Sequence, residues 1–200
     1  MLKTQYEGEL FLHRLAWEIA EEQARRASER KQGWSRPGLV AMIFAFHTVE
    51  AYMNLVGIKI APYIWEDEEN FFRKEPYRGW KGKLRKIMEL VNLPWTEKER
   101  PLKTVLELKE LRDRIAHGKP ENLSREMLHP DGSEPPVLVS DLWSMFTPKE
   151  KIAWAMDDAE RLINQIHAIA ATKMNDPWLG HDALRGATWH TSGTTTVHPG

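Results

Sequence analysis

The fold is decided by an apolar stretch, Leu39–Val56, which reads LVAMIFAFHTVEAYMNLV. Its apolar residues lie nearly all round a helix, and a helix that is apolar on every side is buried. The pattern therefore predicts a central buried helix that starts after Pro37 and ends near Ile60. Two polar residues inside it, His47 and Glu50, are three positions apart, so their side chains are able to touch.

Amphipathic stretches elsewhere in the chain predict the packing partners of this helix. In each of them apolar residues recur at spacings of three and four, which makes one apolar stripe along a helix. These stretches cover residues 2–31, 80–93, 102–115 and 147–174. Capping-box patterns at Thr96 and Thr147 mark the beginnings of the last two. Five helical segments favour an all-α fold, a helical bundle of about five helices.

The remaining segments predict one long loop and a tail. Residues 119–141 contain a turn and few periodic apolar positions, and Val137–Val139 has the composition of a short strand. After residue 174 the chain is rich in glycine, threonine, serine and histidine. We therefore expect a domain over residues 1–174, followed by an extended or poorly ordered, flexible tail over residues 175–200.

Composition narrows the class of protein. The 200 residues are 42% hydrophobic, which is enough for a core, and the formal net charge of −1 argues against a globally basic nucleic-acid-binding protein. The absence of cysteine excludes disulfides, thiolate metal sites and cysteine nucleophiles. No apolar run approaches 18 residues and the N-terminus lacks a signal-peptide pattern, so we expect a cytoplasmic protein with no membrane segment.

The segment LKELRDRIAHG, residues 108–118, carries the strongest chemical signal. Arg112 offers a permanent cation whose planar fork fits phosphate oxygens, and His117 can move a proton near neutral pH. Asp113 lies four positions before His117, on the same helix face, where it is placed to hold the imidazole in one tautomer. Together these groups suit metal-free cleavage of a phosphodiester by the 2′-OH of the same RNA strand.

An ordinary helix end accounts for the same residues. A histidine in the last turn followed by glycine is a common helix stop. A protonated histidine near a helix C-terminus also gains about 0.3–1 kcal/mol from the helix dipole. On spacing alone, Arg112 and His117 therefore fit a structural role as well as a catalytic one.

The order of residues around this pair, Leu-Arg-Asp-Arg-Ile-Ala-His-Gly, resembles the HEPN superfamily. The resemblance is specific over residues 108–118 and looser over residues 39–56, where FHTVEAYMN is similar to the central helix of such domains. It implies a helical bundle that pairs as a homodimer and brings two Arg-x4-His motifs into one cleft. Active members of the family are metal-independent endoribonucleases that leave a 2′,3′-cyclic phosphate, often in toxin–antitoxin, defence or RNA-processing systems.

Carried onto this chain, the resemblance implies that Arg112 stabilises the charge on the phosphate and that His117 acts as acid or base. Asp113 occupies a position where asparagine is also common. The resemblance also implies RNA as the substrate, no cofactor, and a protein partner of the antitoxin kind. Because many family members lack activity, the alternative is a non-catalytic module that binds a nucleotide or a protein. A plain structural helical protein is the third interpretation.

A basic and aromatic cluster lies between the central helix and the motif. Cations follow phosphates and rings stack on unpaired bases, so Arg78, Lys81, Lys83 and Trp80 are candidate RNA-binding residues. The alternative, which we favour, is that Trp80 belongs to the core with Leu84, while the lysines form the solvated face of the same helix.

His47 and Glu50 need partners if the central helix is buried, because buried polar groups form hydrogen bonds. A pair satisfied within the core is the simpler interpretation. The functional one is that they support the motif from behind, and the specific prediction is an ion pair between Glu50 and Arg112. No metal site is expected, because no array of ligands has suitable spacing and the histidines of the tail are irregularly placed, at His181, His190 and His198.

Overall fold

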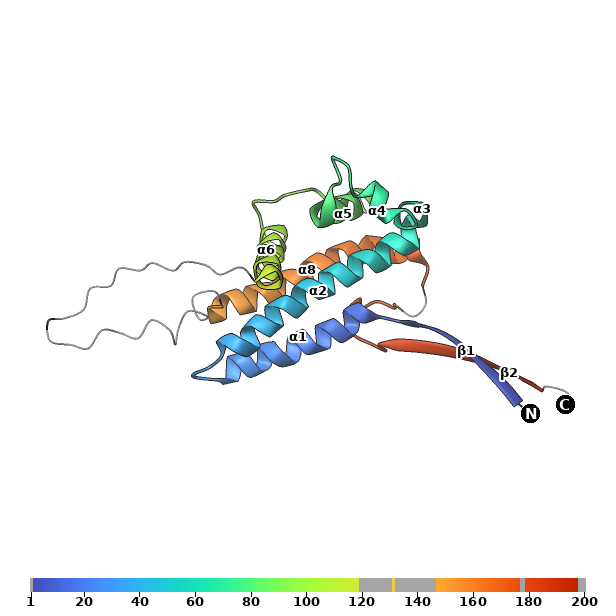
Figure 1. Ribbon diagram of the computed structural model, residues 1–200, viewed down its shortest axis with the longest axis horizontal. Coiled ribbons are helices and arrows are strands. Elements are labelled where there is room, and N and C mark those ends of the chain that lie inside the picture. Colours follow the sequence, from blue (N-terminus) through green and yellow to red (C-terminus); the bar gives the residue numbers. More distant parts are fainter. Residues whose placement is uncertain (1, 119–130, 132–146, 177–178, 198–200) are drawn as a thin grey trace.

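Three long helices form the body of the molecule in the computed structural model, which describes residues 2–118, 131, 147–176 and 179–197. They are α1 (Leu12–Glu29), α2 (Ser35–Ile60) and α8 (Lys149–Met174), and they lie lengthwise beside one another (Figure 1). The predicted all-α helical bundle is confirmed.

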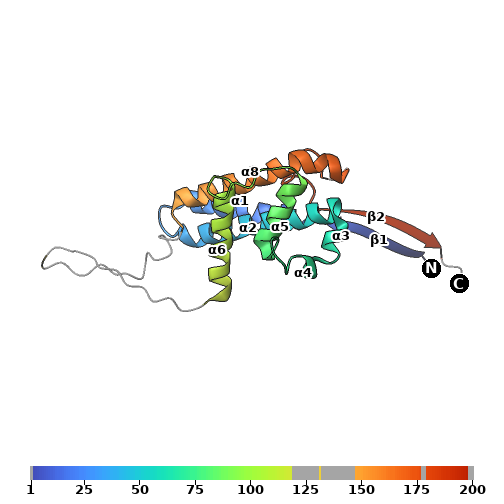
Figure 2. The same ribbon diagram turned by 90° about the horizontal axis from the view of Figure 1, so that it is seen from above.

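A fourth long helix, α6 (Leu102–His117), runs across the other three (Figure 2). Between α2 and α6 the chain forms two short helices, α3 (Pro62–Trp65) and α4 (Glu68–Phe71), and the longer α5 (Gly79–Leu90). Figure 2 shows that the C-terminal half of α6 extends past the side of the bundle. The motif over residues 108–118 therefore lies where α6 leaves α2.

Helix α2 is the buried central helix that the sequence predicts. Seven of its apolar side chains are fully shielded from solvent, Ala41, Ala45, Phe46, Val49, Tyr52, Met53 and Val56. They contact α1 on one side and α8 on the other, so the apolar residues all round the helix find partners in every direction.

Among the described residues, α2 is also the one helix that is long and apolar enough to cross a membrane. An 18-residue window within it has a mean hydropathy of 1.5, so length and composition alone do not exclude a membrane-spanning helix, as we had expected them to do. Half of that window is buried against the rest of the protein, as in the core helix of a bundle.

The two ends of the chain form an antiparallel ribbon, with β1 (Leu2–Leu10) paired along its whole length with β2 (Trp189–Val197). Tyr6 lies opposite Gly193, and Leu10 lies opposite Trp189 at the root of the ribbon. Figures 1 and 2 show the ribbon projecting from one end of the bundle.

This ribbon corrects two of our expectations. The first helix was expected from residue 2, but it begins at Leu12, because residues 2–10 pair with the far end of the chain. The tail is extended over residues 189–197, yet it is a paired strand, and Leu179 and Leu184 before it are buried. The packed structure therefore does not end at residue 174. The expected loop over residues 119–141, with its candidate strand at 137–139, lies outside the described residues apart from residue 131.

The crossing of α2 and α3 depends on Gly57. A Cβ atom placed there would lie 2.0 Å from the ring of Trp65, which is itself buried. We expect Gly57→Ala to lower the free energy of unfolding by about 1–3 kcal/mol, because a packed core has no room for the added methyl group. Urea denaturation measures the change. The control is Ile58→Ala on the exposed side of the same helix, which should cost less than Gly57→Ala; equal losses would contradict this account.

Candidate functional site

The Arg112 guanidinium is the centre of a polar group at the crossing of α2 and α6. We call this group the α2–α6 site; it comprises Phe46, His47 and Glu50 on α2, and Arg112 and Asp113 on α6. Arg112 Nη2 donates to Glu50 Oε1 at 3.3 Å, Nη1 lies 3.0 Å from Asp113 Oδ1, and the guanidinium carbon lies 4.9 Å from the centre of the Phe46 ring. These contacts hold the cation in one place while leaving 27% of its side chain exposed.

The contacts of Glu50 confirm two predictions from the sequence. The ion pair between Glu50 and Arg112 is present, and His47 Nδ1 lies 3.3 Å from the other oxygen of the same carboxylate. Both α2 side chains are part-exposed, so the pair is at the edge of the core rather than inside it. Glu50 therefore connects His47 to Arg112.

Asp113 takes partners that differ from the predicted one. Its carboxylate pairs with Lys109 one turn earlier, at 2.5 Å, and with Arg112. The hydrogen bond from Lys109 is the main reason that the pKa of Asp113 lies below its usual value, with smaller contributions from Arg112 and His117. Among the described contacts there is no hydrogen bond between the His117 imidazole and the Asp113 carboxylate. Within a single chain, no hydrogen bond therefore supports the expected role of Asp113 in holding the imidazole.

His117 is the last residue of α6 and is exposed. The helix stops there because Gly118 adopts the left-handed conformation, with φ of 48°, and its N–H donates to the carbonyl oxygen of Arg114. At 100° per residue, five positions place His117 about 140° around the helix from Arg112. Arg112 thus faces α2 while His117 faces away from it, and one chain does not bring the two onto a common face.

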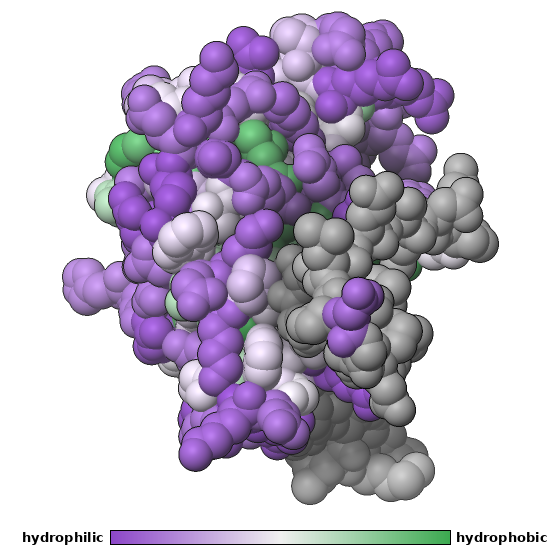
Figure 3. Space-filling model, turned by 90° about the vertical axis from the view of Figure 1, so that its left-hand side faces the viewer, coloured by the Kyte–Doolittle hydropathy of each residue, from purple (hydrophilic) through white to green (hydrophobic). Residues whose placement is uncertain are grey.

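A cavity of about 370 Å³ lies on the other face of α6, between α6 and α8. Its walls include Leu111, Arg114, Lys151 and Trp154. By helix periodicity, His117 continues the row of Arg114 and therefore borders this side of α6. Figure 3 shows this end of the molecule, where a largely hydrophilic surface surrounds small separate hydrophobic areas.

The two candidate RNA-binding lysines of α5 are paired with acids. Lys81 lies 2.7 Å from Glu97, and Lys83 lies 2.9 Å from Glu68. Leu84, on the other side of α5, is fully buried. This fits the interpretation that we favoured, in which the lysines form the solvated face of a core helix.

Trp80 and Arg78 have different places at the start of the same helix. The ring of Trp80 lies 4.8 Å from that of Phe46, so it supports the ring on which Arg112 lies. Arg78 is the residue directly before α5 and borders a cavity of about 280 Å³ with Lys81 and Trp95. Of the four candidates, the structure brings only Trp80 to the α2–α6 site.

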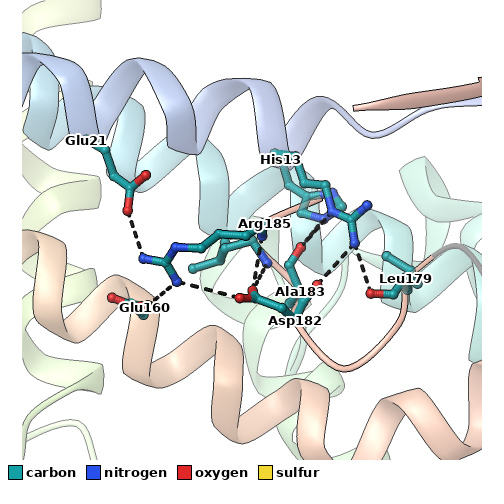
Figure 4. Close-up of polar contacts among 9 residues, drawn as sticks. His13, Glu21, Glu160, Leu179, Asp182, Ala183 and Arg185 are labelled. Atoms are coloured by element: carbon teal, nitrogen blue, oxygen red, sulfur yellow. Dashed lines mark hydrogen bonds and ion pairs between the residues drawn. The ribbon is translucent and has the colours of Figure 1, made fainter. Parts of the chain in front are cut away.

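A buried polar cluster that the sequence analysis missed lies at the other end of the bundle. Arg14 is 2% exposed, and its guanidinium donates to four backbone carbonyl oxygens at 2.7–3.3 Å, those of Leu179, Asp182, Ala183 and Ala187. His13 Nε2 lies 2.8 Å from the Ala183 oxygen as well (Figure 4). We call His13, Arg14 and the backbone of residues 179–187 the C-terminal clamp, because they attach the end of the chain to α1.

Two more side chains extend the C-terminal clamp to α2 and α8. His167 Nε2 lies 3.2 Å from the carbonyl oxygen of Gly180, which can only accept, so this nitrogen carries the proton. His167 Nδ1 therefore accepts from the Tyr52 hydroxyl at 2.7 Å. Burial raises the pKa of Tyr52, which keeps this hydroxyl protonated. The signal in the sequence was the pair His13-Arg14 inside a stripe of leucines.

On the surface next to the C-terminal clamp, Arg185 joins three elements (Figure 4). Its guanidinium lies 2.7 Å from Glu160 on α8 and 2.8 Å from Glu21 on α1. Asp182 Oδ1 accepts from the backbone N–H groups of Leu184 and Arg185, which fixes the turn between them. The C-terminal segment is therefore held by both side chains and backbone.

Comparison with known proteins adds no relative: no protein-family model, no curated protein and no solved structure matches the chain. In the described part of the chain, no group of three or more histidine, aspartate or glutamate side chains is arranged to hold a metal ion.

Proposed function

We propose that the protein is a metal-independent endoribonuclease of the HEPN type, active as a cytoplasmic homodimer. The observation that carries the proposal is the fixed position of Arg112 between Glu50 and the Phe46 ring, at the edge of the core, on the helix that ends at His117. A cation that is held in place but part-exposed can receive a phosphate without reorganising.

The direction of the two side chains supports the proposed pairing of two chains. Since Arg112 and His117 lie about 140° apart around α6, a complete site needs residues from a second copy of α6. The end of α6 extends past the bundle, so it is accessible to such a copy (Figure 2).

The chemistry balances without a metal. The 2′-OH loses its proton to a base and attacks phosphorus, the bond to the 5′-oxygen breaks, and an acid protonates that oxygen. His117 of the two chains would supply the base and the acid, and Arg112 would bind the non-bridging oxygens as their charge increases. The products are a 2′,3′-cyclic phosphate and a free 5′-OH.

A non-catalytic binding module is the second candidate, and one observation favours it. Glu50 and Asp113 both contact Arg112, so two carboxylates offset its charge. An RNA phosphate would have to approach against these acids, whereas a cationic or neutral protein surface would not.

The experiment is a cleavage assay on single-stranded RNA with EDTA present. We expect cleavage with cyclic phosphate ends, and a rate at least about 100-fold lower in His117→Ala and Arg112→Ala, since each change removes proton transfer or charge stabilisation. The matched controls are His181→Ala and Arg25→Ala, which change exposed residues outside the site.

Cleavage that disappears with EDTA, or that is equal in wild type and His117→Ala, would contradict the ribonuclease. If a folded wild-type homodimer does not cleave RNA, the non-catalytic binding module becomes the better account. Loss of partner binding in Arg112→Ala would then support that account.

A further inference from the structure

The ribbon of β1 and β2 has two open edges. An isolated two-stranded ribbon is at best marginally stable in water, and three or more strands are needed for independent stability. Figures 1 and 2 show the ribbon leaving the bundle, so the helices do not cover it. Near its root, Leu10 and Trp189 are opposite each other and are 58% and 60% exposed.

The root of the ribbon is firmly attached to the bundle. Phe11 is buried, its backbone N–H donates to the carbonyl oxygen of Thr188 at 2.7 Å, and its ring lies 5.8 Å from that of His190. Lys59 at the end of α2 pairs with Glu9 on β1 at 2.7 Å. The C-terminal clamp holds the chain just before β2. The ribbon is therefore presented in a fixed direction rather than as a loose end.

The two edges differ in charge. Strand β1 contains Lys3, Glu7 and Glu9, and charged residues on an edge strand oppose pairing with another chain. Strand β2 contains one titratable residue, His190, and four of the six residues over 191–196 are threonine. A strand that has no lysine, arginine, aspartate or glutamate and is rich in β-branched residues favours pairing with a further strand.

We propose that β2 pairs antiparallel with β2 of a second copy of this chain, so that the two ribbons form one four-stranded sheet. A two-fold axis places like residues near one another, which β2 tolerates because it has no lysine, arginine, aspartate or glutamate, and which β1 would not. Full overlap of the nine residues puts Gly193 opposite its own copy. The two bundles then lie at opposite ends of a sheet about 30 Å long, so this contact is separate from the α6 pairing of the proposed function.

The chain contains no cysteine, so a single introduced cysteine can form a disulfide only with the same cysteine of a second copy. We expect Gly193→Cys to form a disulfide-linked dimer on mild oxidation, because opposed residues of antiparallel strands have the Cα separation that a disulfide requires. Gln5→Cys on the outer strand β1 is the control and should stay unlinked. Equal linkage of the two variants, or no linkage at residue 193, would overturn the proposal.

Sedimentation of the full chain gives the second test. Thr194→Lys should weaken association at least about tenfold, because it places lysines of the two copies close together on the shared edge. Gln5→Lys adds the same charge directly opposite Thr194 on the same ribbon and should associate as the wild type does. Equal association of both variants and the wild type would overturn the pairing through β2. Loss of RNA cleavage in His117→Ala, by contrast, tests only the proposed function of the α6 site.

Discussion

Replacing Arg14 by methionine should lower the free energy of unfolding by about 3–5 kcal/mol. The guanidinium is almost fully buried and donates to four backbone carbonyl oxygens, so its loss removes this donor from all four, and only the Ala183 oxygen keeps a second one, from His13. Methionine fills a similar volume and keeps the helix, so the change removes the hydrogen bonds rather than the packing.

Urea denaturation of the purified chain measures this loss. Arg185→Met is the matched control, because Arg185 also joins the C-terminal segment to α1 and α8 but is half exposed, and surface ion pairs contribute about 0–1 kcal/mol. We also expect proteolysis after residue 174 to become faster in Arg14→Met only. A loss no larger than that of Arg185→Met would mean that the C-terminal clamp does not stabilise the fold.

The central helix could be predicted from the sequence because its signal is local. Residues 39–56 are apolar on every side, and no other element of a small bundle needs that pattern. The ion pair between Glu50 and Arg112 could also be predicted, since a carboxylate in a buried helix needs a cation nearby and the motif helix offers one.

The ribbon could not be predicted because its pairing joins residues at opposite ends of the chain. Leu2, Tyr6 and Leu10 have the spacing of four that a helix uses, but they are also alternate members of a strand. Periodicity does not separate these two cases, and the partner strand, which is rich in threonine, has the composition of a tail.

The geometry of the motif escaped prediction for a different reason. Arg112 and His117 are close in the sequence, which suggests that their side chains act at the same place. Helix periodicity instead turns them to different sides of α6. Helix spacing allows Asp113 to pair with Lys109 one turn before it or with His117 one turn after it, and in the structure it pairs with Lys109.

Acid should destabilise the protein through His13 before its carboxylates are fully protonated. Burial is the main reason that the pKa of this imidazole falls from 6.5 to about 4, because the charged form is poorly solvated beside Arg14. The unfolded chain therefore binds more protons than the folded chain between these two values. Stability is complete above about pH 6.5 and falls as the pH decreases toward 4, by roughly 3 kcal/mol from this residue.

The measurement is urea denaturation at several pH values between 7 and 4, on the wild type and on His13→Gln. Glutamine keeps an N–H that can donate to the carbonyl oxygen of Ala183 but does not titrate, so the variant should lose much less stability across this window. The other titrating groups are common to both proteins, and the difference between the two curves isolates His13. If the stabilities of the wild type and His13→Gln fall in parallel from pH 7 to pH 4, His13 is not held neutral in the folded protein. The C-terminal clamp would then be open to water in solution.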